Sequence, residues 1–221
     1  MINKGIILAG GMGTRMSPLT KAVNKQLLPI YDKPLIFYPL SILMISEIKD
    51  ILIISTPQDT PLYKNLLGNG DNFGLNINYM IQEKPEGIAQ AFLIASSFLN
   101  GQNSVLILGD NLFYGDTLIK KFQEANSSDN SATIFGYKVR DPERYGVIEF
   151  DKNNIVKSIC EKPSIPKSKF AVTGIYFYDK DVVKYAKEIT KSKRGELEIT
   201  DLNNIYIRKR KLRVEICGRG S

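Results

Sequence analysis

The chain has 221 residues, 43% of them hydrophobic, and carries a formal net charge of +7. This length suits one large domain, and the positive charge favours anionic partners such as nucleotides, nucleic acids or membrane surfaces without choosing among them. Histidine is absent, which excludes Ser-His and Cys-His catalysis and histidine-ligated metals and leaves carboxylates, lysine and arginine for any chemistry.

Along residues 1–111, short apolar strands alternate with helical segments, which is the pattern of an α/β protein with a parallel sheet. Helices are predicted from Pro34, a favourable first-turn residue, and over 61–68 and 87–101, where Gly68 and Gly101 would end them. Strands are predicted at Ile6–Leu8, Asp50–Thr56, Leu75–Gln82 and from Ser104 to Asp110.

The second half of the chain is less regular. A turn is predicted at Asp151–Asn154, and the polar stretch Asn126–Ser131 is expected to be a mobile loop. Strands are predicted at 131–139, 145–150, 155–163, 170–179 and 212–217, and helices at 182–189 and 197–211.

Three glycines, Gly10, Gly11 and Gly13, follow the first predicted strand. Glycine permits positive φ angles and lets main-chain N–H groups approach a ligand closely, so this turn suits a phosphate. The spacing fits neither well-known phosphate loop, because no Gly-Lys-Ser/Thr occurs and position 16, where G-x-G-x-x-G needs its last glycine, is Met16.

Basic residues come directly after this turn, with Arg15 first and Lys21 and Lys25 following. Arginine matches phosphate oxygens with a planar fork of donors and lysine acts as a point charge, so the segment suits a triphosphate. An ordinary tight turn with solvated basic residues remains the alternative.

Further polar residues lie where predicted parallel strands end, which is where open α/β sheets bind ligands. Gln82 closes one strand, and Asp110 with Asn111 follows another. Asp110 is a candidate Mg²⁺ ligand, because this cation is commonly held by one or two carboxylates plus phosphate oxygens. Capping of the following turn is the equally weighted alternative.

A second group of polar residues lies in the later half: Tyr145 with Gly146, Glu161 with Lys162, and the stretch from Arg194 to Asp201. Lys162 could neutralise a second phosphate, and Glu161 could accept hydrogen bonds from hydroxyl groups. A solvated ion pair and a helix-capping segment remain the alternatives.

Several long motifs resemble one known family. They include L-A-G-G-x-G-T-R-x-x-P-x-T at Leu8–Thr20, K-Q-L-L-P at Lys25–Pro29, "LGDNLFYGD", "DPERYGVIEFD" and "RGELEITDLN". These runs, in this order over essentially the whole chain, closely resemble sugar-1-phosphate nucleotidylyltransferases. The resemblance implies a Rossmann-like mixed, mostly parallel sheet flanked by helices. It also implies transfer of a nucleotidyl group, most closely from dTTP, to glucose 1-phosphate or a close sugar 1-phosphate, with release of pyrophosphate.

The resemblance also implies roles for individual residues. Arg15, Lys25, Asp110 and Lys162 would be catalytic, with Asp110 as the Mg²⁺ ligand, and no general base is needed because the attacking phosphate oxygen is already ionised. Gln82 and Gly87 would recognise thymine. The nucleotide site would comprise Leu8, Gly10, Gly13, Thr14, Arg15, Lys25, Gln82, Gly87 and Asp110, and the sugar-phosphate site Tyr145, Gly146, Glu161, Lys162, Val172 and Arg194.

In the family, the G-R-G motif at Gly218–Gly220 is followed by a segment with a second metal carboxylate and by helices that contact other subunits. Residues 1–221 are therefore expected to form a single nucleotidyltransferase domain without that segment, which leaves the family's homotetramer open. Such a domain would keep a nucleotide pocket but catalyse weakly. The main alternative is a nucleotide-binding or nucleotide-sugar-binding fragment without turnover.

Two other functions are weaker alternatives. The basic run Arg208–Arg213 suggests a nucleic-acid binder, but no aromatic residues are interleaved with it for stacking on bases. A glycosyltransferase would carry a D-x-D metal motif, and the near match Asp179–Asp181 is predicted to begin a helix.

The sequence also indicates the cellular compartment and the state of the two cysteines. The most apolar run, Leu35–Ile45, contains Pro39 and is too short to span a bilayer, and no signal-peptide stretch opens the chain. A cytoplasmic protein is therefore expected. Cys160 and Cys217 do not form a C-x-x-C pair and are expected to be reduced and buried.

Overall fold

The structure, a computed structural model, describes residues 2–11, 13, 16–21, 23–115, 117–127, 131–153 and 155–218. Within these residues, nine strands form one sheet, whose main path is β11, β7, β10, β6, β1, β4 and β5. The strands β6, β1, β4 and β5 are parallel, whereas β10 is antiparallel to β6 and β7, so the predicted mixed, mostly parallel sheet is confirmed. In path order the bounds are Leu212–Cys217, Ala132–Lys138, Phe170–Tyr178, Ser104–Leu108, Lys4–Leu8, Asp50–Ser55 and Asn76–Ile81.

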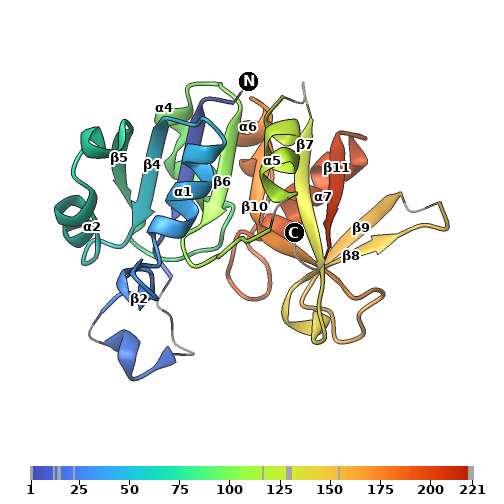
Figure 1. The fold of residues 1–221 in the computed structure, drawn as a ribbon. Coiled ribbons are helices and arrows are strands. Elements are labelled where there is room, and N and C mark those ends of the chain that lie inside the picture. Colours follow the sequence, from blue (N-terminus) through green and yellow to red (C-terminus); the bar gives the residue numbers. More distant parts are fainter. Residues whose placement is uncertain are drawn as a thin grey trace.

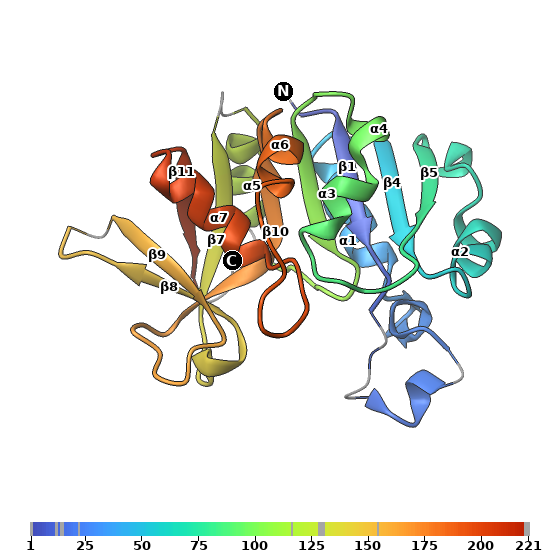
Figure 2. The ribbon, with the colours of Figure 1, turned by 180° about the vertical axis from the view of Figure 1, so that it is seen from behind.

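Helices cover both faces of this sheet (Figures 1 and 2). One buried hydrophobic cluster lies under α1, α2 and α5, and a second lies under α3, α4, α6 and α7. Successive strand residues alternate between the clusters, with Ile7 in the first and Ile6 in the second, because neighbouring side chains on a strand point to opposite faces. The helices are α1 Phe37–Ile45, α2 Thr60–Leu67, α3 Gln90–Ile94, α4 Ser96–Leu99, α5 Leu118–Ser127, α6 Val182–Ala186 and α7 Ile199–Arg208.

Two substructures leave the main sheet. The strands β8 (Gly146–Phe150) and β9 (Val156–Glu161) form an antiparallel hairpin that pairs with the start of β10. In Figure 1 this hairpin splays outward beside β11, while β2 (Pro29–Ile30), which pairs with β3 (Lys33–Pro34), lies below β1 and β4. Both substructures therefore lie next to the edge at which β1 and β6 end.

Two predicted helices differ from the observed ones. The first begins at Phe37 and not near Pro34, because Lys33–Pro34 pairs with Pro29–Ile30 as a strand. The helix predicted over 87–101 is broken at Ala95 into α3 and α4, and its left-handed end falls on Asn100, where φ is 46°. The remaining predicted strands and helices are found with small shifts of their ends.

One helix was not predicted from the sequence, and one cysteine is exposed where burial was predicted. The helix α5 presents Leu118, Phe122 and Ala125 to the core at spacings of four and three residues, although most of its other residues are polar. Cys217 is buried as expected, but Cys160 is exposed because it lies on the outward face of the hairpin strand β9. None of the helices in the described ranges combines the length and apolar character needed to cross a bilayer.

Candidate active site

The glycine turn after β1 packs closely against two side chains of the predicted nucleotide site. Gly13 has φ +56°, and a Cβ atom there would fall 2.8 Å from the methyl group of Thr20 and 3.2 Å from Cβ of Lys25. At Gly10, a Cβ atom would fall 2.8 Å from Oε1 of Gln82. The turn therefore needs glycine at both positions, and it lies directly beside Lys25 and Gln82. Thr14 and Arg15 lie outside the described residues.

Lys25 is paired with the carboxylate that follows β6. Its Nζ atom lies 2.9 Å from Oδ2 of Asp110, and the amide of Asn111 donates to Oδ1 of Asp110 at 3.0 Å. Both oxygens of Asp110 therefore accept from side chains, and no backbone donor to them is found among the described residues. The pair joins the segment after β1 to the end of β6, which adjoins β1 in the sheet.

A buried polar network holds the backbone next to Lys25. Asn24 caps the 3₁₀ helix Lys25–Leu27 by accepting from the amide of Gln26, and its own amide donates to Asp59 at 2.6 Å. The hydroxyl of Tyr63 donates to Asn24 at 3.0 Å, and burial raises the pKa of this tyrosine, so the hydroxyl keeps its proton. Lys25 therefore extends from a backbone that is fixed on both sides.

The two residues predicted to recognise thymine lie between β5 and α3, with Gln82 directly after the strand. Gln82 is buried, and its amide donates to Oε1 of Gln90 at 2.6 Å. Gly87 has φ +106°, and a Cβ atom there would come within 2.6 Å of the amide nitrogen of Leu197 and still closer to its carbonyl oxygen. No other residue type fits at Gly87 without moving the segment that contains Leu197.

The predicted sugar-phosphate residues gather at the open end of the β8–β9 hairpin. Glu161 accepts from the hydroxyl of Thr200 at 2.6 Å, and Gly146 lies opposite Glu161 in the hairpin. A Cβ atom at Gly146 would fall 3.3 Å from Oε2 of Glu161. Lys162 follows with φ 40°, and its amide donates to the carbonyl of Tyr145 at 2.9 Å.

Arg194 is held by three carboxylates. Its guanidinium nitrogens lie 2.9 Å from Glu196, 3.2 Å from Glu198 and 3.4 Å from Glu161. The side chain of Arg194 is 38% exposed, so these ion pairs remain partly solvated. Arg194 is fixed in position beside Glu161.

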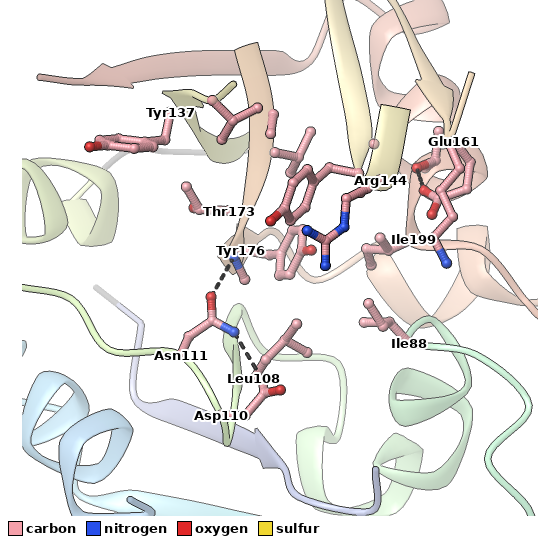
Figure 3. Close-up of a pocket in the computed structure, with 18 of the residues that line it drawn as sticks. Ile88, Leu108, Asp110, Asn111, Tyr137, Arg144, Glu161, Thr173, Tyr176 and Ile199 are labelled. Carbon is pink, nitrogen blue, oxygen red and sulfur yellow. Dashed lines mark hydrogen bonds between the residues drawn. The ribbon is translucent and has the colours of Figure 1, made fainter. Parts of the chain in front are cut away.

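A cavity of about 660 Å³ brings much of the predicted site together. Figure 3 shows Asp110 and Asn111 on one side of it and Glu161 on the other, with Tyr176 and Arg144 between them. The predicted residues that line the cavity are Asp110, Tyr145, Gly146, Glu161, Lys162, Val172 and Arg194. Leu8, Gly10, Gly13, Lys25, Gln82 and Gly87 do not line it; Lys25 adjoins it through Asp110, and Gly87 through its neighbour Ile88.

Several lining residues were not indicated by the sequence. Tyr176 is 3% exposed, and its pKa is raised by burial and by the negative charges of Glu161 and Asp110. Its side chain therefore lies near carboxylates from both sides of the cavity. Asn111 approaches Gly174 so closely that a Cβ atom there would fall 2.6 Å from its Oδ1. Strand β10 also has a register shift between Val172 and Tyr176, which alternation along a strand does not reveal.

Asp110 is the candidate metal ligand at this edge of the sheet. Among the described residues no group of three or more aspartate, glutamate or cysteine side chains is placed to hold a metal ion. That is compatible with Mg²⁺, which is bound through one or two carboxylates while substrate phosphates and water complete its shell.

Two of the five basic residues at 208–213 form internal ion pairs. Lys211 lies 3.6 Å from both Asp179 and Asp181, and Arg213 pairs with Glu215. Asp181 precedes α6, as expected for a helix start and not for a metal motif. These contacts favour neither the nucleic-acid nor the glycosyltransferase alternative.

The fold and the paired charges at the strand ends are those of an enzyme that handles nucleotides, and the chain belongs to the nucleotidyl transferase family, whose model matches residues 4–221. It is 53% identical over 217 residues to glucose-1-phosphate thymidylyltransferase of Neisseria gonorrhoeae, covering 98% of this chain and 75% of the relative. The resemblance drawn from the motifs is therefore confirmed.

Solved structures agree with this assignment. A Bacillus anthracis protein in complex with a sucrose superimposes with a TM-score of 0.89 at 41% identity, covering 97% of this chain and 87% of that one. UDP-glucose pyrophosphorylase complexed with UDP-glucose gives a TM-score of 0.85 at 25% identity, covering 99% and 91%.

Proposed function

We propose that the chain transfers the thymidylyl group of dTTP to glucose 1-phosphate, giving dTDP-glucose and pyrophosphate. The observation that carries the proposal is one cavity lined by Asp110 on one side and by Glu161, Lys162 and Arg194 on the other. Relatives that share about half of this sequence are named for this reaction. An oxygen of the sugar phosphate attacks the α-phosphorus of dTTP, and the bond from that phosphorus to the pyrophosphate oxygen breaks.

The nucleotide would bind across the ends of β1, β5 and β6. Backbone groups of the glycine turn would hold the triphosphate, and Lys25, already fixed beside Gly13, would supply positive charge. Gln82 and Gly87 would recognise the thymine ring. The proposal assigns the remaining triphosphate contacts to Leu8, Thr14 and Arg15, of which Thr14 and Arg15 lie outside the described residues.

The sugar phosphate would bind at the open end of the hairpin. Glu161, oriented by Thr200, would accept hydrogen bonds from sugar hydroxyls. Lys162 and Arg194 would neutralise the phosphate, and Arg194 would exchange part of its carboxylate contacts for phosphate oxygens. Tyr145, Gly146 and Val172 would complete the wall around the ring.

The chain's own residues need to move no proton. The attacking oxygen is ionised at neutral pH, so catalysis rests on holding two phosphates in line and on neutralising charge as pyrophosphate leaves. Asp110 would be the protein ligand of a Mg²⁺ ion, which when bound would neutralise charge on the phosphates. Lys25 and Lys162 would approach the reacting groups from opposite sides of the cavity.

The test is product formation by the purified chain. Pyrophosphate release is followed with dTTP, glucose 1-phosphate and Mg²⁺, and dTDP-glucose is identified by mass spectrometry. Parallel reactions replace dTTP with UTP and glucose 1-phosphate with galactose 1-phosphate. Tight dTTP binding by calorimetry without any nucleotide-sugar product would replace this proposal with the non-catalytic binding fragment.

A further inference from the structure

Two segments from different halves of the proposed site lie against each other. The segment Gln82–Gln90 contains the residues proposed to recognise the base, and the segment Lys191–Glu198 contains Arg194. The amide of Leu197 donates to the carbonyl of Glu86 at 2.7 Å, and the amide of Ala89 donates back to Leu197 at 3.2 Å. The backbones are therefore in direct contact.

One ion pair reinforces this contact. Nζ of Lys191 lies 2.5 Å from Oε1 of Glu86, and the two side chains are 49% and 35% exposed. The other carboxylate oxygen of Glu86 accepts from the amide of Gln90 at 3.2 Å, and Oε1 of Gln90 accepts from Gln82 at 2.6 Å. Hydrogen bonds thus run without a break from Gln82 to Lys191.

On the other side of Lys191, a tight turn presents Arg194. The amide of Ser192 donates to the carbonyl of Glu196. The hydroxyl of Ser192 accepts from the amide of Arg194 at 3.1 Å and donates to Glu198 at 2.8 Å. Lys191 is the residue immediately before this turn. Its side chain ties the base of the turn to Glu86.

We propose, on the basis of the proposed function, that Lys191 and Glu86 are positioning residues that couple nucleotide binding to sugar-phosphate binding. A base bound by Gln82 and Gly87 holds the segment Gln82–Gln90 in one conformation. Through Glu86 and Lys191 this also holds the turn that presents Arg194, so the sugar phosphate then meets a cation that is already in place. Coupling between two binding sites is reciprocal, so each ligand strengthens the other.

Lys191 is the residue to vary, because Glu86 also contacts Gln90 and its replacement would disturb the base site. Lys191→Met removes the charge and keeps the stem, whereas Lys191→Arg keeps the ion pair. The matched control is Lys157→Met, which breaks an exposed ion pair with Glu149 at 3.1 Å on the β8–β9 hairpin.

The measured quantity is the ratio of glucose 1-phosphate dissociation constants without and with α,β-methylene-dTTP, which cannot react at the bond that breaks. Calorimetry is expected to show this ratio about threefold smaller in Lys191→Met, the size typical of an exposed ion pair. In turnover the KM for glucose 1-phosphate at saturating dTTP should rise about threefold, and so should the KM for dTTP at saturating glucose 1-phosphate, while kcat stays nearly constant. Lys191→Arg and Lys157→Met should match the unaltered chain.

An unchanged ratio in Lys191→Met would overturn the inference. The inference would also fail if Lys157→Met changed the ratio equally, or if Lys191→Arg did not keep the ratio of the unaltered chain. A purely structural role would lower the melting temperature without changing the ratio, which also counts against coupling. Failure of the proposed function gives a different result, because the unaltered chain itself would then form no dTDP-glucose, whatever the ratio of dissociation constants in the variants.

Discussion

Asp110 offers the sharpest test of the proposed site, because the chain contains a closely matched ion pair elsewhere. Lys25 and Asp110 are 2.9 Å apart with side chains 28% and 35% exposed. Lys4 and Asp50 are 3.0 Å apart with side chains 17% and 36% exposed. The first pair lies where parallel strands end, and the second lies where β1 and β4 begin. Asp110→Asn and Asp50→Asn therefore remove the same charge at opposite ends of the parallel strands.

The two substitutions should have similar effects on stability and different effects on catalysis. Partly exposed ion pairs contribute about 0–1 kcal/mol, so each variant should lower the melting temperature by no more than about 4 °C in a chain of this size. Removing a preorganised group that meets developing charge costs about 3 kcal/mol, or on the order of a hundredfold in kcat. Only Asp110→Asn should show that loss.

The assay is steady-state pyrophosphate release at saturating dTTP and glucose 1-phosphate, repeated across Mg²⁺ concentrations. Asp110→Asn should be about a hundredfold slower and should need more Mg²⁺ for half-maximal rate, while Asp50→Asn should be nearly unaffected. Retention of more than about a tenth of the rate by Asp110→Asn, with an unchanged Mg²⁺ requirement, would refute the role assigned to this carboxylate.

Three further outcomes are expected. Gly87→Ala should lower kcat/KM at least about tenfold and the free energy of unfolding by about 1–3 kcal/mol, because φ is +106° and the new Cβ would strike Leu197. Thr200→Val should raise the KM for glucose 1-phosphate about fivefold with little change in the KM for dTTP, because Glu161 loses a 2.6 Å hydrogen bond. Glu149→Gln should lower the melting temperature at neutral pH. A serine hydrogen bond and two lysines hold the pKa of Glu149 at about 2 against an ordinary 4.5, so the difference from the unaltered chain should fade as the pH drops from 4.5 towards 2.

Each of these outcomes has a control. Gly68→Ala carries a similar backbone strain at φ +57° with open space around it, so it should lower stability and leave activity intact. Thr133→Val removes a buried hydroxyl that has no partner among the described residues and should not change the KM for glucose 1-phosphate. Equal activity losses in Gly68→Ala and Gly87→Ala, or a pH-independent effect of Glu149→Gln, would contradict the respective reasoning.

Much of the fold could be predicted because its signals are local. The runs at 5–8, 51–54 and 105–108 are apolar throughout, as is typical of strands buried on both faces. The errors arose where a distant contact overrides a local preference. Pro34 suits a helix start, yet a two-stranded pairing with Pro29 holds it in extended backbone.

In the candidate site, too, local signals could be predicted from the sequence and distant contacts could not. Asp110, Gln82 and the glycine turn could be predicted as site residues because the carboxyl ends of parallel strands share one edge. The pairing of Asp110 with Lys25 could not be predicted, because the two residues lie 85 positions apart and their contact depends on how the segment after β1 folds back.

The pairing of charges also explains how a site without histidine can stay ready for anionic substrates. Lys25 is held by Asp110 from another segment, and Arg194 is held by Glu161 and by two carboxylates of its own segment, so each cation has a fixed position before any ligand arrives. On the proposed function, a phosphate that approaches Arg194 would exchange with an existing carboxylate contact. The net gain would then be a difference between two ion pairs, and a doubly charged phosphate would compete best. Selectivity for phosphorylated sugars would follow from the same carboxylates that position the cation.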